Sequence, residues 1–331
     1  MDGQCEIGGY IDLERNSGSQ YHEAGIALNC GRNCLSYLIE LRKISSIRIP
    51  DYLCGAVRQT CERLNLDVKE YEVGHNFCPN YDFRLGSDEY FYLVDYFGQL
   101  TEEQVSYARH FSSDKLIIDE AQCFFRKPWD GIDTLYTCRK FFGVPDGAYL
   151  FLGKEDAFGR KLQQDESYNR MKHILGRYER SGYEFFQESQ DNESFFENAP
   201  ILEMSPITRN IMRGIDYDIV RAHRESNFDI LHSALSTLNG LDVSPPIGPY
   251  MYPLFVEHPE CFRSGLIEKK IYVPTLWPNV ISDCDPNSFA YAYATSIIPI
   301  PLDQRYGKEE MERIINVVYE IVNTMRTSLR L

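Results

Sequence analysis

Lys140 is the residue whose surroundings in the sequence most strongly suggest chemical reactivity. It follows the apolar run at residues 135–138 and precedes Phe141 and Phe142, so its amine stands beside apolar side chains. An amine in such a setting can act as a nucleophile and form a Schiff base with an aldehyde. A lysine taken alone is far more often an ordinary surface residue, so the hypothesis needs partners elsewhere in the chain.

A carboxylate and an amide follow another apolar run. Asp119 comes directly after residues 116–118, and Gln122 stands three positions later. A carboxylate at the tip of a buried strand is partly desolvated and needs a cationic or donor partner, for which a protonated pyridine nitrogen would serve. Gln122 could approach the same flat ligand and donate to a phenolate oxygen. The alternative is that Asp119 only caps the next helix.

The third segment is a turn. Gly31, Arg32 and Asn33 stand between an apolar run and a helical stretch. Free backbone N–H groups at the start of a helix attract an anion, and glycine permits its close approach. Taken by itself, the turn is more simply explained as an ordinary helix start.

Together the three segments supply an anion cup, a carboxylate for a pyridinium and a Schiff-base lysine, which are the parts of a site for pyridoxal 5'-phosphate (PLP). Their order and surroundings resemble the DegT/StrS family of fold-type-I aminotransferases, which mostly act on keto groups of nucleotide-linked sugars. The resemblance extends from about residue 24 to 323. It is strongest in residues 118–122, 139–147 and 301–306.

The resemblance implies a role for each matching residue. Lys140 would form the Schiff base with PLP and later transfer protons, and Asp119 would keep the pyridine nitrogen protonated. Gln122 would contact the ring hydroxyl. The turn at residues 31–33 matches the family's phosphate-binding turn, with backbone N–H groups as donors.

Further cofactor contacts have several candidates. A flat side chain normally covers the ring, and Tyr52 and Cys54 both match that stretch of the family. The family's phosphate-binding serine, five positions before the lysine, is Leu135 here, so Thr137 is the nearest substitute. Arg139 is another candidate for the phosphate.

Alternating apolar runs and helical stretches must position these segments. Strands are predicted near residues 26–28, 47–50, 67–73, 90–96, 115–118, 135–138 and 148–152, with helices between several of them. Near-continuous apolar strands separated by helices predict an α/β fold with a mainly parallel sheet buried on both faces. In such sheets ligands bind beyond the carboxyl ends of the strands, which is where Asp119 and Lys140 fall.

The sequence texture also predicts two domains. A large PLP-binding α/β domain is expected at residues 1–215, with a charged helical insert at about 155–200. A smaller α+β domain is expected at residues 216–331. Its strands are predicted at 252–256 and 271–274, and an amphipathic helix is predicted near the C-terminus.

The composition excludes some classes of protein. With 331 residues, 43% hydrophobic and 25% charged, the chain is an ordinary globular protein. A formal charge of −15 argues against nucleic acid or an anionic membrane as the main partner, because both require a basic face. No apolar run approaches the ~20 residues that span a bilayer, and the N-terminus lacks a signal-peptide core, so we expect a cytoplasmic protein.

Cysteine and histidine spacing does not suggest a metal. Ten cysteines in a chain of this length do not form a disulfide scaffold, so reduced thiols are expected. The two His-x-x-Cys pairs, His75/Cys78 and His258/Cys261, lack the paired Cys-x-x-Cys spacing of structural zinc sites. No metal site is therefore predicted.

These observations predict a PLP-dependent aminotransferase that moves an amino group from a donor such as glutamate to a keto substrate. The resemblance implies a nucleotide-linked keto sugar of surface-polysaccharide or amino-sugar biosynthesis as the acceptor. It also implies a homodimer with the active site at the interface, although the position of the family's cross-subunit asparagine falls on Ile201. The alternatives are another PLP enzyme (a lyase, decarboxylase or dehydratase) or a non-catalytic regulatory protein that kept the fold. Lys140 argues against the family's sugar dehydratases, in which this lysine is typically replaced.

Overall fold

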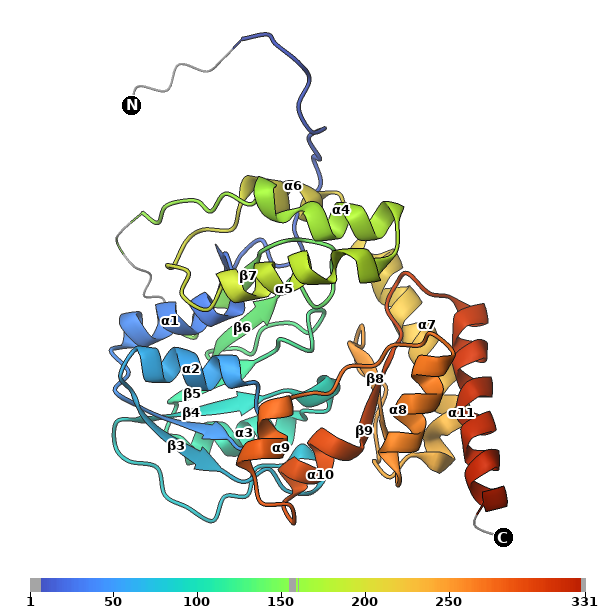
Figure 1. The fold of residues 1–331 in the computed structure, drawn as a ribbon. Helices are drawn as coiled ribbons and strands as arrows, with labels where there is room; N and C mark the ends of the chain where they lie inside the picture. Colours follow the sequence, from blue (N-terminus) through green and yellow to red (C-terminus); the bar gives the residue numbers. More distant parts are fainter. Residues whose placement is uncertain (1–6, 155–158, 160, 329–331) are drawn as a thin grey trace.

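A seven-stranded sheet forms the centre of the larger part of the chain (Figure 1). The computed structural model describes residues 7–154, 159 and 161–328. In chain order the strands are β1 (Ile26–Leu28), β2 (Ser46–Pro50), β3 (Asp67–Tyr71), β4 (Glu89–Val94), β5 (Leu116–Asp119), β6 (Asp133–Thr137) and β7 (Ala148–Phe151). Their order across the sheet is β1-β7-β6-β5-β4-β2-β3.

Most strands of this sheet run parallel. The pairs β2–β3, β2–β4, β4–β5 and β5–β6 are parallel, whereas β7 is antiparallel to both β6 and β1. Strands β5 and β6 are buried along their whole lengths, as expected when other elements cover both faces. The predicted α/β class with a mainly parallel sheet is therefore confirmed.

Helices follow the strands of the large sheet. They are α1 (Gly31–Arg42), α2 (Gly55–Arg63) and α3 (Glu102–Phe111), and α1 packs against β6, β7 and α2. Helix α3 begins with a capping box, in which Thr101 and Gln104 satisfy each other's backbone N–H groups. Within the described residues, no helix is both long and apolar enough to cross a membrane.

The second half of the chain adds an insert and a smaller unit. The insert contains α4 (Lys172–Glu179) and α5 (Phe186–Phe195), and α6 (Pro206–Arg213) follows. Part of the predicted start of the insert, at residues 155–158 and 160, lies outside the described residues. Figure 1 shows α4, α5 and α6 together at one end of the large sheet.

The smaller unit is built on a two-stranded antiparallel sheet of β8 (Met251–Phe255) and β9 (Ile297–Pro301). Its helices are α7 (Tyr217–Leu235), α8 (Pro259–Glu268), α9 (Pro278–Asp283), α10 (Phe289–Ser296) and α11 (Lys308–Ser328). Helix α11 packs against α7 and α8, so the predicted amphipathic C-terminal helix buries its apolar face there (Figure 1).

One predicted strand is wrong. Residues 271–274 form no strand, and β8 pairs instead with β9. The segment leaves α8 through Lys270, whose φ is +58°, and the carbonyl of Pro274 accepts a hydrogen bond from Arg263. Its apolar residues therefore reflect local packing of a coil against α8, which a short apolar run does not distinguish from a strand.

Asp146 fastens the loop after β6 to the start of α6. Its carboxylate is fully buried and accepts hydrogen bonds from the Ser205 backbone N–H at 2.8 Å and the Ser205 hydroxyl at 2.7 Å. The Thr208 hydroxyl donates to the same carboxylate. Because Asp146 stands six residues after Lys140, this link holds the lysine's loop against the body of the protein.

Asp146→Ala should lower the free energy of unfolding by about 3–5 kcal/mol, because it leaves buried donors without acceptors. Urea denaturation would measure the change. Asp130→Ala, at an exposed position, is the matched control and should alter stability by less than about 0.5 kcal/mol. Equal effects of the two substitutions would contradict the anchoring role of Asp146.

Candidate active site

The carboxyl ends of β5 and β6 lie next to each other and bring two predicted site segments together. The strands are parallel, and Asp119 at the end of β5 is in register with Leu135 of β6. Strand β6 continues to Thr137, and Lys140 follows in the next turn. A single edge of the sheet therefore carries both the candidate acid and the candidate nucleophile.

The Asp119 carboxylate is held by two donors. The Tyr92 hydroxyl donates to Oδ2 at 2.7 Å, and the Ala121 backbone N–H donates to Oδ1 at 2.8 Å. Asp119 is buried, with 7% of its surface exposed. Tyr92 was missed by sequence reasoning, although its strand β4 pairs with β5. Each carboxylate oxygen keeps acceptor capacity for a further N–H group.

Tyr52 and Cys54, the two candidates for covering the ring, lie in different surroundings. The Tyr52 ring is fully buried and packs edge-on against Trp277, with ring centroids 4.7 Å apart. Burial raises the pKa of the Tyr92 phenol well above its ordinary range, and the neighbouring Asp119 and Cys54 side chains contribute to that rise. Cys54 is half-buried and directly precedes α2.

Gln122 is held from one side and free on the other. Its Oε1 accepts the Phe97 backbone N–H at 2.8 Å, whereas its Nε2 is buried and has no hydrogen-bond partner among the described residues. Phe97 and Gly98 both have positive φ, +54° and +77°, and form the tight turn after β4 that aims this N–H. A Cβ on Gly98 would lie 2.5 Å from Pro246, so only glycine fits.

Lys140 stands in a loop fixed by two side chains from the smaller unit. The carbonyl of Phe141 accepts hydrogen bonds from Gln304 Nε2 at 2.8 Å and from Arg224 at 3.3 Å. Arg224 also donates to Gln304 Oε1 and to the Pro249 carbonyl, each at 2.8 Å. Burial lowers the pKa of Arg224 to about 10, and the guanidinium remains protonated at neutral pH.

The amine of Lys140 faces an aromatic ring. Its Nζ lies 5.6 Å from the ring centroid of Tyr250, a residue whose carbonyl also contacts Arg224. No hydrogen bond or ion pair holds this Nζ within the described part of the chain. The lysine is therefore positioned by its loop, and its amine has no such partner among the described residues.

The start of α1 lies beside the lysine loop, which is the segment between β6 and β7 (residues 138–147). Arg32 Nη2 and Arg139 Nη1 contact the two oxygens of one carboxylate, Glu193 of α5, at 2.7 and 2.8 Å. Gly31 has open space where a Cβ would be, because no atom lies within 4 Å of that position. Arg32, in the first turn of α1, and Arg139 therefore lie against the same carboxylate.

Asn33 and Thr137 have different places in this region. The Asn33 side chain donates to Asn29 Oδ1 at 2.8 Å and to the Pro200 carbonyl at 2.7 Å, while its backbone N–H bonds to Cys30. These bonds tie α1 to the segment after the insert and leave Asn33 a structural role. Thr137 is the last residue of β6 and is buried.

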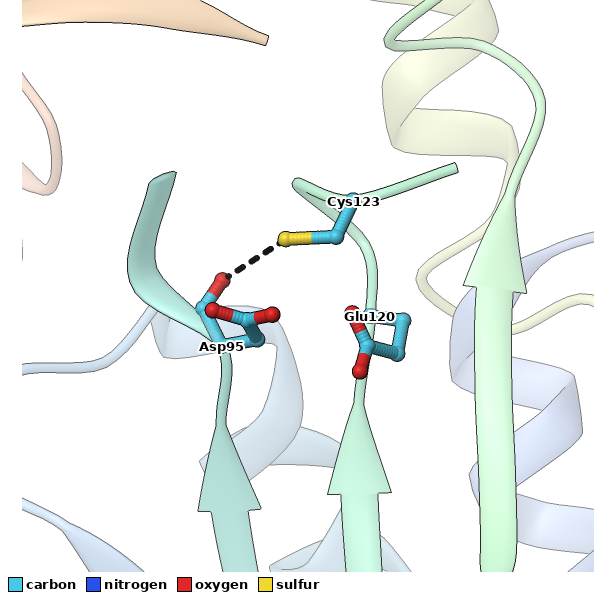
Figure 2. Close-up of side chains that lie close together, drawn as sticks. All are labelled: Asp95, Glu120 and Cys123. Carbon is cyan, nitrogen blue, oxygen red and sulfur yellow. Dashed lines mark hydrogen bonds between the residues drawn. The ribbon is translucent and has the colours of Figure 1, made fainter. Parts of the chain in front are cut away.

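A second buried acidic group lies behind the candidate site. Figure 2 shows Asp95 and Glu120 at the ends of neighbouring strands, with the Cys123 sulfur donating to the Asp95 carbonyl at 3.3 Å. Arg126 Nε lies 3.1 Å from Asp95 Oδ2 and 3.9 Å from Glu120 Oε2. A guanidinium thus stands where a metal ion would otherwise neutralise the two acids.

Burial raises the pKa of both acids of this pair. Burial, together with the Asp95 charge, raises the pKa of the Glu120 carboxyl well above its ordinary range. Burial also raises the pKa of Asp95, although Arg126 opposes that rise. Trp129 Nε1 donates to Glu120 Oε1 at 2.6 Å, which favours the charged form and opposes part of this rise. The Arg126 guanidinium therefore opposes the rise in pKa of both buried acids.

The predicted thiol state agrees with the structure. Nine cysteines lie in the described part of the chain, and all are free thiols. Of the two His-x-x-Cys pairs, Cys78 accepts a hydrogen bond from Gln104 at 2.8 Å, and His258 lies 3.6 Å from Glu260.

Comparison with known proteins supports the assignment of the fold. No protein-family profile matches the sequence, and no curated protein is significantly similar to it. Solved structures are similar. A DegT DnrJ EryC1 StrS aminotransferase from Brucella abortus superimposes with a TM-score of 0.61 at 12% identity, over 89% of this chain and 85% of that chain.

Two further structures agree. The sugar aminotransferase CalS13 from Micromonospora echinospora has a TM-score of 0.60 and 12% identity, over 88% of this chain and 86% of its own. NtdA from Bacillus subtilis, solved with the bound cofactor PMP, has a TM-score of 0.65 and 11% identity, over 90% of this chain and 73% of its own. The chain has the fold of PLP-dependent aminotransferases. The fold predicted from the resemblance is thus confirmed over nearly its whole length.

The Asp95–Glu120 pair makes stability depend on pH. Because the folded pKa of Glu120 is above its ordinary 4.5, its contribution is full below that value and is lost as pH rises through the folded pKa. The wild type should therefore lose up to about 1.4 kcal/mol per pH unit in that window. Glu120→Gln, which cannot ionise, should flatten the profile in urea denaturation as the pH rises above 4.5.

Glu103→Gln, at an exposed position of α3, is the control and should leave the pH profile unchanged. A profile for Glu120→Gln that runs parallel to the wild type would show that Glu120 is already ionised in the folded protein.

Proposed function

We propose that this chain is a PLP-dependent aminotransferase that moves an amino group from a donor such as glutamate to a keto acceptor. One observation carries the proposal: Asp119, Gln122 and Lys140 follow two adjacent parallel strands, on a fold shared with aminotransferases. A nucleotide-linked keto sugar is the proposed acceptor class, because CalS13 is described as a sugar aminotransferase.

The residues present fit PLP. The Nε2 of Gln122 is a buried donor without a partner among the described residues, and the ring oxygen of PLP would be a suitable acceptor for it. Asp119 is a buried carboxylate whose oxygens can each accept a further hydrogen bond, such as one from a pyridinium N–H. The open space at Gly31, at the first turn of a 12-residue helix, suits a phosphate. These three groups meet the three polar ends of the cofactor.

When bound, PLP would supply an electron-withdrawing ring that stabilises negative charge on the substrate carbon next to nitrogen. Asp119, fixed by Tyr92, would hold the proton on the ring nitrogen and thereby keep the ring cationic. Gln122 would orient the ring oxygen. The Nζ of Lys140 would move the proton between the substrate carbon and the cofactor, because its loop is rigid while the amine is free.

Assembly and location belong to the same proposal. The resemblance to DegT/StrS enzymes supports a homodimer with the active site at the subunit interface, and it supports a cytoplasmic location. Sedimentation of the purified protein would measure the mass of the assembly.

Lys140→Ala should abolish covalent attachment of PLP. Borohydride treatment of the wild type with PLP should add the cofactor's mass to the peptide that contains Lys140, as read by mass spectrometry. The alanine variant should show no such addition, and amino transfer from glutamate should fall by about 10²–10⁴-fold or more. Lys127→Ala, at an exposed position, should behave as the wild type. Labelling at another lysine would refute the assignment.

Asp119→Asn should leave PLP binding measurable but reduce the half-reaction with an amino donor by about 10²–10³-fold, because an amide does not stabilise a pyridinium charge. Stopped-flow absorbance would follow the half-reaction. Tyr92→Phe removes a donor to Asp119 while keeping the carboxylate, so its loss should be smaller. If the two variants lost activity equally, the charge of Asp119 would not be the deciding feature.

A further inference from the structure

One carboxylate of the chain itself lies against both cations of the anion cup. Glu193 Oε1 is 2.7 Å from Arg32 Nη2, and Glu193 Oε2 is 2.8 Å from Arg139 Nη1. Glu193 is the third residue from the end of helix α5. Arg32 is in the first turn of α1, and Arg139 directly precedes Lys140. Three segments far apart in the sequence therefore meet at one carboxylate.

Helix α5 is fastened at this place by neighbouring residues. Asn192 Nδ2 donates to the Pro145 carbonyl of the lysine loop at 2.9 Å, and its Oδ1 is buried without a hydrogen-bond partner among the described residues. The Phe196 ring, directly after α5, is fully buried against Cys30 and lies 4.5 Å from the Arg139 guanidinium carbon. The position of Glu193 is thus set by packing as well as by charge.

The carboxylate leaves the cup incompletely satisfied. The Nε atoms of Arg32 and Arg139 are both buried and have no hydrogen-bond partner in the described structure. Open space remains at Gly31, at the head of α1. A carboxylate has two oxygens and one charge, whereas a phosphate monoester has three free oxygens and nearly two charges, so it can engage more of these donors.

We propose that Glu193 competes with the cofactor phosphate: its carboxylate pairs with Arg32 and Arg139, and it is displaced when the phosphate of PLP binds. This inference rests on the proposed function. The carboxylate offsets the repulsion between the two neighbouring guanidinium groups. Its displacement removes one of the contacts that hold the end of α5 against the lysine loop, and the affinity for PLP is lower by the free energy of the lost pairs.

Glu193→Gln is the central test. The amide removes the competing charge at nearly constant volume, so PLP should bind about 3- to 30-fold more tightly, measured by titration of protein fluorescence or cofactor absorbance. The same titration with pyridoxal, which lacks the phosphate, should give equal affinities for wild type and variant. The phosphate group alone should thus carry the difference.

Glu197→Gln is the matched control. It removes one negative charge just past α5, at an exposed position that does not contact Arg32 or Arg139. Its PLP affinity should equal that of the wild type, which separates local competition from the overall charge of the protein.

Hydrogen exchange gives a second readout that does not depend on activity. Backbone amides near the end of α5 should exchange faster in the PLP-bound wild type than in the free wild type, because the Glu193 contacts are lost. In Glu193→Gln the difference between free and bound protein should be smaller.

Two results would overturn the inference. Weaker PLP binding by Glu193→Gln would show that Glu193 orients the arginines for the phosphate, and equal changes for PLP and pyridoxal would show that it acts elsewhere. Failure of the proposed function looks different, because the wild type itself would then bind no PLP.

Discussion

The guanidinium of Arg224 is bonded to the amide oxygen of Gln304 and to backbone carbonyls, and within the described residues no carboxylate pairs with it. It comes from α7 of the smaller unit, yet it reaches the carbonyl next to Lys140 and the segment that leads into β8. The planar guanidinium donates hydrogen bonds to several carbonyl oxygens at once, which a lysine amine at this position would not do. The geometry of the candidate site depends on this one buried cation.

Other cations serve the same region while the chain as a whole carries a net charge of −15. Arg126 balances the Asp95–Glu120 pair behind the site, and Arg32 and Arg139 gather at the first turn of α1. Each of these cations therefore forms an ion pair with a defined carboxylate nearby. An acidic protein can still bind a phosphate in such a place. The attraction of two nearby arginines and a helix N-terminus outweighs the repulsion of distant negative surface charges, because salt screens the distant charges.

Much of the fold was predictable because its signals are local. Strands such as β5 are continuous apolar runs, and the residues at their ends follow from the geometry of parallel sheets, so Asp119 and Lys140 could be placed at one edge. The error at residues 271–274 arose because a short apolar run does not show its partner. The Tyr92–Asp119 hydrogen bond and the Glu193 contacts join residues far apart in the sequence, and no local sequence pattern predicts such contacts. For the same reason the sequence left Tyr52 and Cys54 as equal candidates.

The anchoring of the lysine loop also has a consequence for how the protein is made. The loop at Phe141 is completed by Gln304, which belongs to the segment between β9 and α11 near the end of the chain. A ribosome releases residues in order, so the sheet and its lysine emerge long before the side chains that hold the loop in place. The edge of the sheet that carries the candidate site is therefore completed among the last parts of the molecule, after most of the sheet has already been synthesised.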